Sequence, residues 1–311
     1  MDVRYVQDSP PPGWPSPVAA LGNFDGMHRG HNALIAEVCK RAAAIHGTPV
    51  AVIFDPHPAQ VLRPEKAPAL LMTLDQKLKA LERAGIGGVA IVRFDHEVSR
   101  WEPEAFVERV LLTWLRVAEV WVGENFLFGR DRTGTFTLLR ALGQDKGFRT
   151  EKIDPVLYKD FVASSSRVRR LLSEGRVDEA AHCLGHPYVI AGTVVRGDGR
   201  GRELGMPTAN MATENPLLPT HGIYATRAEV GGVWHPAVTS IGVRPTIGDN
   251  KLTVETFLLD GTYDLYGTRM QLAFVQWLRD ERKFEDLAAL KAQMFKDADD
   301  ARVVLALAKA D

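Results

Sequence analysis

Two histidines stand three residues apart in the stretch LGNFDGMHRGH, which covers residues 21–31 and follows a predicted strand. Histidine side chains can donate hydrogen bonds to phosphate oxygens, and the N-terminus of a helix attracts the same anions. The surrounding glycines let the backbone come close to a ligand. A pair such as His28 and His31 is more often structural or solvated. Its setting between the carboxyl end of a parallel strand and a helix nevertheless favours phosphate binding.

The stretch matches neither of the two common phosphate-binding motifs. A Walker loop needs GxxxxGK followed by Ser or Thr, and the dinucleotide fingerprint is GxGxxG. Neither pattern occurs in LGNFDGMHRGH, so both interpretations lose support. An HxxH-like element after a glycine turn is what remains.

A second group of candidate residues lies within residues 192–211, a glycine-rich stretch that ends in MPTANM. Glycine backbone amides can wrap a phosphate, although glycine-rich loops alone are a weak signal. Thr208 and Asn210 carry hard oxygen donors of the type that suits Mg²⁺ beside nucleotide phosphates. Alternation along an extended chain would direct both side chains to the same side.

Glu255 lies farther along the chain, on a predicted strand. A glutamate on a strand is most often exposed to solvent. Its apolar neighbours Val254, Phe257 and Leu258 indicate that this strand is largely buried. The Glu255 carboxylate is therefore a candidate catalytic group.

The first part of the chain has the alternation of a parallel α/β fold. Between about residues 18 and 156, short apolar or β-branched runs alternate with amphipathic stretches, which is the pattern of a βαβ series. We expect strands, with crossover helices between them, at VAALG, VAVIF, VAIVRF and EVWVG. Two short helical stretches follow before His186 and Pro187 interrupt the pattern. The first domain is therefore predicted to span residues 1–186.

After Pro187 the pattern changes to strands without intervening helices, which indicates an antiparallel β-barrel or sandwich. Gly231 and Gly232 between two of these runs are a strong hairpin signal. Residues 284–308 keep a helical period with an apolar stripe that can pack on the barrel. We predict a second domain over residues 187–311, an antiparallel β-barrel with a terminal helix.

The composition narrows the class of partner. The chain has 311 residues, enough for two domains with cores of their own. Lys and Arg number 38 against 39 Asp and Glu, so the net charge of −1 gives no reason to expect a nucleic-acid or anionic-membrane binder. The polar, proline-rich start lacks the apolar run of a signal peptide, and no segment approaches a membrane span. We expect a cytoplasmic protein with small-molecule partners, a monomer or weak homo-oligomer.

Four ordered motifs in the first domain resemble those of the bacterial bifunctional riboflavin kinase/FAD synthetases. They are GNFDGMHRGH, FDPHP at 54–58, VGENFLFGRDRTG at 122–134 and SSSRVRRLL at 164–172. The histidine pair also resembles the HxGH signature of the nucleotidylyltransferases, which implies a Rossmann-type sheet. The second domain is similar to the riboflavin kinase module in the segments MPTAN, GIYA, IGVRPTIG, VETFLLD and DLYG.

The resemblance implies two transfers from ATP. In the second domain the γ-phosphate of ATP would pass to the ribityl 5′-hydroxyl of riboflavin, giving FMN. In the first domain the FMN phosphate would attack the α-phosphorus of ATP and release pyrophosphate, giving FAD. Both activities would use Mg²⁺. The adenylylation needs no covalent nucleophile, so the protein would contribute positioning and charge stabilisation.

The resemblance also implies roles for individual residues. Glu255 would be the base of the kinase, and His28 and His31 would contact the ATP phosphates and stabilise the developing charge. Binding of ATP or phosphate would involve Gly22, Asn23, Phe24, Gly30, Ser164, Ser165, Ser166, Arg169, Gly197, Gly199 and Gly201. Flavin binding would involve Asn125, Asp55 and His57, and Mg²⁺ would be held by Thr208 and Asn210.

Some of these residues also have a simpler interpretation. The SSSRVRR stretch could be a serine helix cap with a solvated basic face. His57, between two prolines, could have no role beyond fixing the loop at the end of a strand. The sequence also departs from the family pattern, since Ser166 replaces a more usual Thr, Ala163 a more usual Ile, and Leu127 a common basic residue.

Two other functions stay open. One domain could be active and the other regulatory, although candidate reactive residues in both domains weigh against this. Alternatively, the chain could sense a flavin or a nucleotide without turnover. An assay of α-phosphate transfer separates a catalyst from a sensor.

Overall fold

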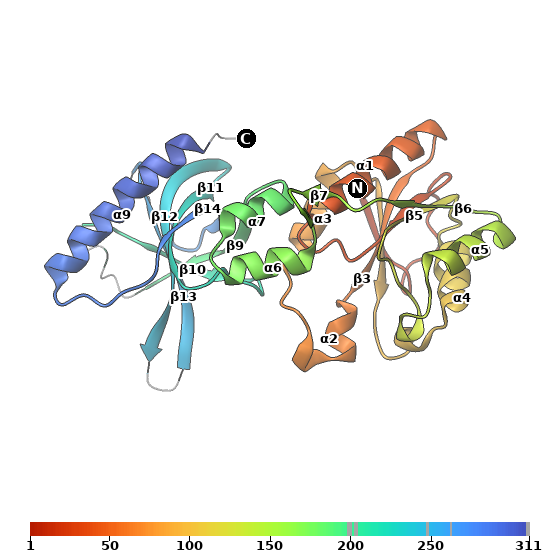
Figure 1. Cartoon of the computed structure of the whole chain (residues 1–311), viewed down its shortest axis with the longest axis horizontal. Coiled ribbons are helices and arrows are strands. Elements are labelled where there is room, and N and C mark those ends of the chain that lie inside the picture. The colour runs from red at the N-terminus through yellow and green to blue at the C-terminus, as the bar shows by residue number, and fades with distance from the viewer. Residues whose placement is uncertain (198–200, 202–204, 247–248, 262, 309–311) are drawn as a thin grey trace. The chain divides into compact units, whose positions relative to one another are not determined.

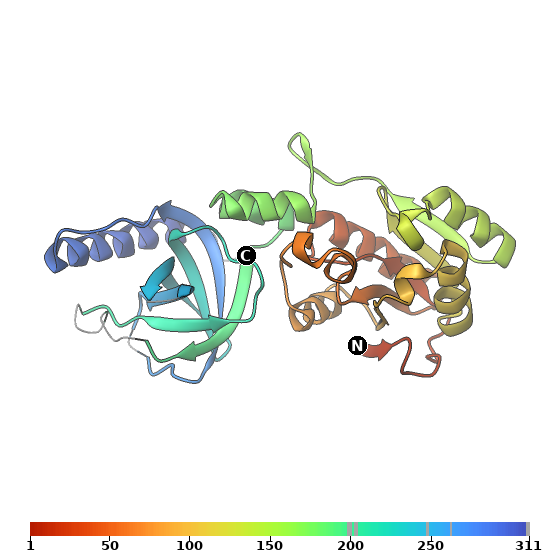
Figure 2. The same ribbon diagram turned by 90° about the horizontal axis from the view of Figure 1, so that it is seen from below.

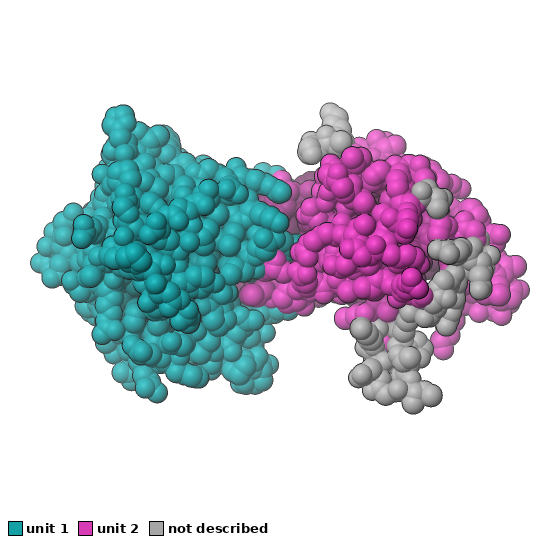
Figure 3. Space-filling view, turned by 180° about the vertical axis from the view of Figure 1, so that it is seen from behind, with its two compact units in different colours: residues 1–69, 74–164 teal, residues 70–73, 165–311 magenta. Residues whose placement is uncertain are grey.

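The computed structural model describes residues 1–197, 201, 205–246, 249–261 and 263–308. The chain forms two compact units, which Figure 3 distinguishes by colour. Unit 1 comprises residues 1–69 and 74–164, and unit 2 comprises residues 70–73 and 165–311. Each unit has its own sheet and its own hydrophobic core.

Unit 1 contains a six-stranded parallel sheet with the strand order β1-β4-β3-β2-β5-β6 (Figure 1). Its strands are β1 (Asp2–Tyr5), β2 (Val18–Leu21), β3 (Pro49–Asp55), β4 (Gly88–Arg93), β5 (Glu119–Gly123) and β6 (Arg149–Ile153). The order reverses at β2, because β3 and β4 lie on one side of it and β5 and β6 on the other. Open α/β sheets bind their ligands at such a point, outside the carboxyl ends of the strands. The predicted parallel α/β fold is confirmed.

Helices surround this sheet. They are α1 (Arg29–Ala44), α2 (Pro58–Leu62), α3 (Leu74–Arg83), α4 (Pro103–Phe106), α5 (Phe136–Lys146), the π-helix η3 (Val107–Trp114), and the turns η1 (Pro64–Lys66), η2 (Val98–Arg100) and η4 (Arg130–Arg132). All four residues of β2 are buried, as expected for a central parallel strand that is covered on both faces. This burial fixes the place of the loop after Leu21, which carries the two histidines. The short strands β7 (Leu157–Tyr158) and β8 (Phe161–Val162) pair with each other near the end of the unit.

Unit 2 contains a closed antiparallel barrel with the strand order β10-β13-β12-β11-β14-β9, so the predicted barrel is also confirmed. Its strands are β9 (Tyr188–Val195), β10 (Ala209–Thr213), β11 (Gly222–Val230), β12 (Val233–Thr246), β13 (Asp249–Leu258) and β14 (Arg269–Arg279). Gly231 and Gly232, with φ of 59° and 86°, form the predicted turn between β11 and β12. Closure leaves the barrel without an exposed sheet edge.

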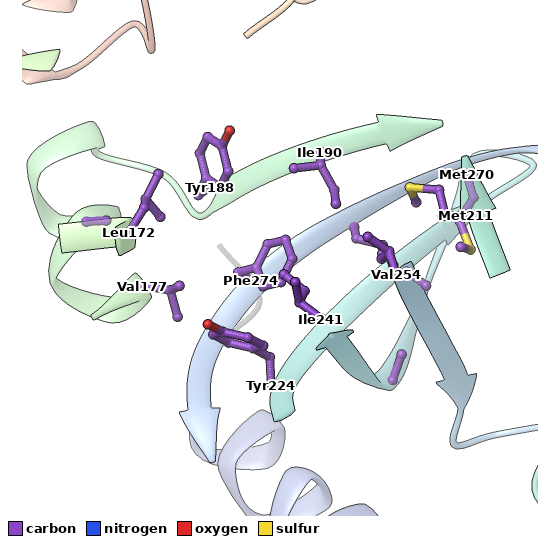
Figure 4. Packing of buried hydrophobic residues seen from close by; sticks show 14 of the residues in the cluster. Leu172, Val177, Tyr188, Ile190, Met211, Tyr224, Ile241, Val254, Met270 and Phe274 are labelled. Carbon is purple, nitrogen blue, oxygen red and sulfur yellow. The ribbon is translucent and has the colours of Figure 1, made fainter. Parts of the chain in front are cut away.

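Two helices, α6 (Ser165–Ser173) and α7 (Val177–Leu184), share the core of the barrel. Figure 4 shows Leu172 and Val177 from these helices close to Tyr224 and Phe274 of the strands. The rings of Tyr224 and Phe274 meet edge to face, with centroids 5.2 Å apart. Both helices precede the boundary at residue 186, yet they pack with unit 2. That boundary stays a prediction about where the two functions divide.

The terminal helix α9 (Leu287–Leu307) lies along the outside of the barrel (Figure 2). It packs against β11 and β12. The Asp286 side chain caps it by accepting a hydrogen bond from the Ala289 backbone N–H at 2.7 Å, so the helix begins at residue 287 and not at 284. An ion pair of 2.6 Å between Arg279 and Asp297 fastens it to β14. In the described part of the chain, no helix combines the length and apolar character that a membrane crossing needs.

Candidate active sites

The loop between β2 and α1 brings the two predicted histidines into contact. Their rings are stacked, with centroids 3.6 Å apart and planes 25° apart. His28 caps α1, because its Nδ1 accepts a hydrogen bond from the backbone N–H of His31 at 3.4 Å. A ring nitrogen that accepts carries no hydrogen, so the neutral His28 ring has its proton on Nε2. That Nε2–H is the group with which His28 can meet a phosphate oxygen.

Both imidazoles are electrically neutral at neutral pH in this structure. Burial lowers the pKa of His28 to about 4. The pKa of His31 is also well below its usual value, because of burial and the nearby charges of His28 and Lys77. The Nδ1 atom of His31 is shut off from solvent and has no hydrogen-bond partner among the described residues. Both rings are therefore neutral without a ligand, and an anionic ligand would raise the affinity of both for a proton.

The turn that carries the histidines is strained. Phe24, Gly26 and Met27 have positive φ angles of 48°, 85° and 44°. Residues other than glycine rarely adopt this backbone conformation. Phe24 is fully buried, and the edge of its ring meets the His31 ring at a centroid distance of 5.2 Å. A Cβ atom on Gly30 would lie 3.1 Å from His28 Cε1. Backbone strain of this kind is concentrated at functional sites.

Next to the turn is a cavity of about 780 Å³. Six aromatic side chains line it, from the ends of strands, the loops that follow them and helix α4: Phe54, Phe94, Trp101, Phe106, Phe126 and Phe128. The predicted residues Gly22, Asn23, His57 and Asn125 also line it, as does Leu127. Arg63, Asp131 and Arg132 add charged groups to the lining. A cavity that combines aromatic walls with polar groups is typical of a site for an aromatic ligand.

Asp55 stands at the end of β3 and is not among the residues that line this cavity. Its charge, together with that of Asp25, acts on Lys77, an α3 lysine that is only 5% exposed. Burial lowers the pKa of Lys77, and the two carboxylates oppose this effect. The role of Asp55 in flavin binding stays a prediction.

The serine cluster falls where the two units divide. Ser164 ends unit 1, and Ser165 and Ser166 are the first two residues of α6 in unit 2, with Arg169 one turn later. The hydroxyls thus lie at the start of a helix, as the sequence predicts. Their role as a phosphate clamp stays a prediction.

In the barrel, strand register brings Asn210 and Glu255 together. Asn210 of β10 is directly opposite Glu255 of β13, and Ser240 of β12 is opposite Glu255 on its other side. The Asn210 and Glu255 side chains lie on the outer face of the barrel, because their strand neighbours Met211 and Val254 belong to its core. The amide and the carboxylate that the sequence singled out separately therefore share one surface.

The glycines before MPTAN permit a close approach of the backbone to this surface. A Cβ atom on Gly197 would lie 2.2 Å from the Asn210 Nδ2 atom, and one on Gly201 would lie 3.0 Å from Thr208 Oγ1. Gly199 lies outside the described residues. Thr208 also lines a cavity of about 390 Å³, together with Pro207, Leu258, Tyr263 and Tyr266, among others.

Several residues of these sites had no signal in the sequence. Lys77 is part of an ordinary amphipathic helix pattern, and its burial depends on the tertiary fold. Glu281 follows β14 and reaches the outer face of β12, where a Cβ atom on Gly242 would lie 2.1 Å from its Oε1. The aromatic cavity residues have the spacing of core residues. Only their position at the ends of parallel strands could have indicated a site.

Known proteins resemble the whole chain. It matches the family model described as FAD synthetase over residues 12–167 and the one described as riboflavin kinase over residues 184–305. It is 38% identical over 290 residues to the bifunctional riboflavin kinase/FMN adenylyltransferase of Pseudomonas fluorescens, with 93% of each chain covered. The protein of that name from Listeria monocytogenes is 37% identical over 293 residues, with 93% of this chain and 92% of the relative covered.

The similarity extends to solved structures. A crystal structure titled as a macrolide-efflux protein from Streptococcus pneumoniae has a TM-score of 0.88 and 25% identity. The match covers 97% of this chain and 99% of that one. Both the parallel sheet and the barrel are therefore within the matched region.

Proposed function

This chain belongs to the family of bifunctional riboflavin kinases/FMN adenylyltransferases, and we propose that it makes FAD from riboflavin in two ATP-dependent steps at separate sites. Residues 187–311 phosphorylate riboflavin, and residues 1–186 adenylylate the FMN that results. The observation that carries the proposal is the pairing of an aromatic cavity of about 780 Å³ with two stacked histidines in unit 1.

For adenylylation, the flavin ring system occupies the aromatic cavity and Asn125 contacts it. An oxygen of the FMN phosphate attacks the α-phosphorus of ATP, and the bond from this phosphorus to the bridging oxygen breaks, so that pyrophosphate leaves. His28 donates from Nε2–H to the ATP phosphates, and His31 lies against it. Ser164, Ser165, Ser166 and Arg169 complete the hold on the triphosphate. Positioning and charge stabilisation supply the rate, because no covalent nucleophile is needed.

For phosphorylation, Glu255 accepts the proton of the riboflavin 5′-hydroxyl as that oxygen bonds to the γ-phosphorus of ATP. The bond from the γ-phosphorus to ADP breaks in the same transfer. The nucleotide lies near Thr208 in the cavity of about 390 Å³, whose tyrosines offer aromatic faces to its base. Asn210 of β10 is directly opposite Glu255 of β13.

The residues around Thr208 fit Mg²⁺. The Thr208 hydroxyl and the Asn210 amide oxygen are hard, neutral donors, and small Gly197 and Gly201 leave space at both. Among the described residues, no cluster of three or more His, Cys, Asp or Glu stands ready to hold a metal ion. Thr208 and Asn210 would therefore hold Mg²⁺ together with nucleotide phosphates, where it would neutralise phosphate charge.

We also propose that the enzyme works in the cytoplasm as a monomer or weak homo-oligomer, without nucleic acid or membrane. The net charge of −1 supports small-molecule partners, since binding to polyanions relies on excess positive charge.

Riboflavin incubated with ATP labelled separately at the α and γ positions tests both steps. We expect label from the γ position in FMN and label from the α position in FAD. A chain that binds flavin and ATP but transfers neither label is a sensor, which contradicts the proposal. Transfer of one label only would leave a single active domain.

A further inference from the structure

His57 holds the start of helix α2. Its Nδ1 accepts a hydrogen bond from the backbone N–H of Ala59 at 3.2 Å. The His57 backbone N–H in turn donates to Gln60 Oε1 at 3.1 Å, so the two residues form a reciprocal cap. Because Nδ1 accepts, the proton of the neutral His57 ring must be on Nε2. The cap thus fixes the tautomer.

The other side of the ring faces Asn23. His57 Nε2 lies 3.1 Å from Asn23 Nδ2 in the structure. Because Nε2–H is a donor and an NH₂ group does not accept a hydrogen bond, the network requires the reversed amide, with the Asn23 oxygen toward Nε2; which end of an amide is oxygen follows from such networks. The NH₂ group of Asn23 is then turned away from His57. It makes no other hydrogen bond within the described part of the chain.

Asn23 occupies the junction of the two parts of the unit 1 site. It lines the aromatic cavity, as His57 does. It also directly precedes Phe24, whose ring touches His31. In the proposed adenylylation, on which this inference rests, the FMN phosphate must meet the α-phosphorus of ATP between cavity and histidine pair.

We propose that His57 is a positioning residue, which turns the Asn23 amide so that its NH₂ group donates to a phosphate oxygen at this junction. His57 acts on the reaction through Asn23 and not through contact with the flavin. Preorganised donors of this kind need no rotation during the reaction, which is why they stabilise transition-state charge well.

Two substitutions separate the two hydrogen bonds of the His57 ring. Asn is short and among the best N-cap residues, so His57→Asn keeps an acceptor near the position of Nδ1 and removes the donor to Asn23. Gln is longer and can carry its NH₂ group to about the position of Nε2, so His57→Gln keeps that donor and gives up the cap. The pair is matched in chemistry, because both side chains are neutral amides.

The test measures kcat and KM for adenylylation of supplied FMN in the full-length chain. We expect His57→Asn to lower kcat by roughly 10- to 100-fold with KM for FMN within about twofold, because a misplaced group costs rate more than binding. His57→Gln should stay within several-fold of wild type. Riboflavin phosphorylation should match wild type, and cooperative thermal unfolding of the same samples establishes that each variant is folded. His57→Gln should unfold at a slightly lower temperature than His57→Asn, because it gives up the cap.

A double-mutant cycle sharpens the result. Removal of a single preorganised donor costs about 100-fold or more, so Asn23→Ala should lower kcat by that factor. If His57 acts only through Asn23, the Asn23→Ala/His57→Asn variant loses no more than Asn23→Ala alone. Multiplying losses would show an independent role for His57 and overturn the inference.

Other outcomes overturn it as well. Activity that is kept by His57→Asn and lost by His57→Gln would make His57 only a helix cap. A rise in KM for FMN in both variants with unchanged kcat would indicate direct flavin contact. A wild-type chain that makes FMN but no FAD would contradict the proposed adenylylation itself, and the inference would fail with it.

Discussion

The polar groups of the unit 1 site come from loops at the ends of parallel strands, whereas Asn210 and Glu255 of the unit 2 site lie on strands of the barrel. Asn23 and His57 belong to two separate connections and meet near the point where the sheet order reverses, and His28 follows in the same connection as Asn23. Asn210 and Glu255 belong to adjacent strands and meet by register. Loop geometry therefore decides the first site and strand pairing the second.

The two sites also differ in how they are protected from water. The unit 1 histidines are desolvated, with His28 only 8% exposed, and burial decides that they are neutral. Glu255 lies on the outer face of the barrel and is half-buried. The chemistry of a desolvated site depends on every residue packed around it. The chemistry of a site on the face of a barrel depends on the side chains at a few strand positions. Substitutions should reveal this difference.

Glu255→Gln tests the site on the barrel strands and should have the largest effect on activity. Gln keeps the shape and removes the base, and a positioned base typically contributes about 100- to 10,000-fold. We expect kinase kcat to fall at least about 100-fold with little change in KM for riboflavin. Adenylylation of supplied FMN should continue. As a control, Glu229→Gln removes another strand carboxylate, on β11, and should leave kinase kcat near wild type.

Near-normal phosphorylation by Glu255→Gln would reduce Glu255 to an ordinary strand carboxylate. Loss of adenylylation as well would show that the two sites are not separate, and the comparison between them would fail.

His28→Ala tests the site that the loops of unit 1 form. The loss of a preorganised phosphate donor costs about 100- to 1,000-fold, so FAD formation should fall by that factor. Riboflavin phosphorylation should be unchanged. His96→Ala changes an exposed histidine of the same unit and serves as the control. Assays with riboflavin and with FMN as separate substrates distinguish the two activities, and equal loss of both in a folded variant argues against the assignment.

The periodicity of the sequence is local information, and it predicted the parallel sheet and the barrel. Residue type and the resemblance to a known family, and not periodicity, pointed to Asn210 and Glu255 individually. Their pairing itself could not be predicted, since register depends on contacts between residues far apart in the chain. Helices α6 and α7 illustrate the same limit: their pattern was visible, but not the core on which they pack.

The unit 1 site shows what sequence patterns miss. Phe54, Phe94 and Trp101 each look like core residues, and only the fold gathers them around one cavity. Lys77 has the spacing of a surface lysine and is buried. The cap that fixes the tautomer of His57 is a backbone contact, which no motif records.

The burial of His28 predicts a dependence of stability on pH. Its pKa is about 4 when folded and near its ordinary value of 6.5 when unfolded, so the unfolded chain binds more protons between these values. The contribution is fully present above about pH 6.5 and is lost as the pH falls toward 4. The shift corresponds to roughly 3 kcal/mol of free energy of unfolding.

Urea unfolding of wild type and His28→Gln between pH 4 and 7 measures the contribution of His28 together with its effect on the stacked His31, because titrating groups elsewhere cancel in the difference. The stability of wild type relative to the variant should decline as the pH is lowered. A difference that stays constant over this range would show that His28 is not desolvated, and the contrast with the barrel site would weaken.

Gly197→Ala should have the smallest effect, and it tests whether the barrel site tolerates a local displacement. The added Cβ atom would lie 2.2 Å from Asn210 Nδ2, so the Asn210 side chain must move. The atom it meets belongs to the end of a side chain and not to the backbone, so the strand itself can stay in place. We expect kinase kcat to fall about tenfold, less than the roughly 100-fold cost of a full 1 Å misplacement of a reacting group. Gly123→Ala, where a Cβ atom meets nothing within 4 Å, is the matched control.

Unchanged kinase activity in Gly197→Ala would mean that the position of the Asn210 amide does not matter, and Mg²⁺ binding would have to be sought at other residues. A fall in adenylylation would instead show that the change disturbs unit 1, contrary to the separation of the two sites.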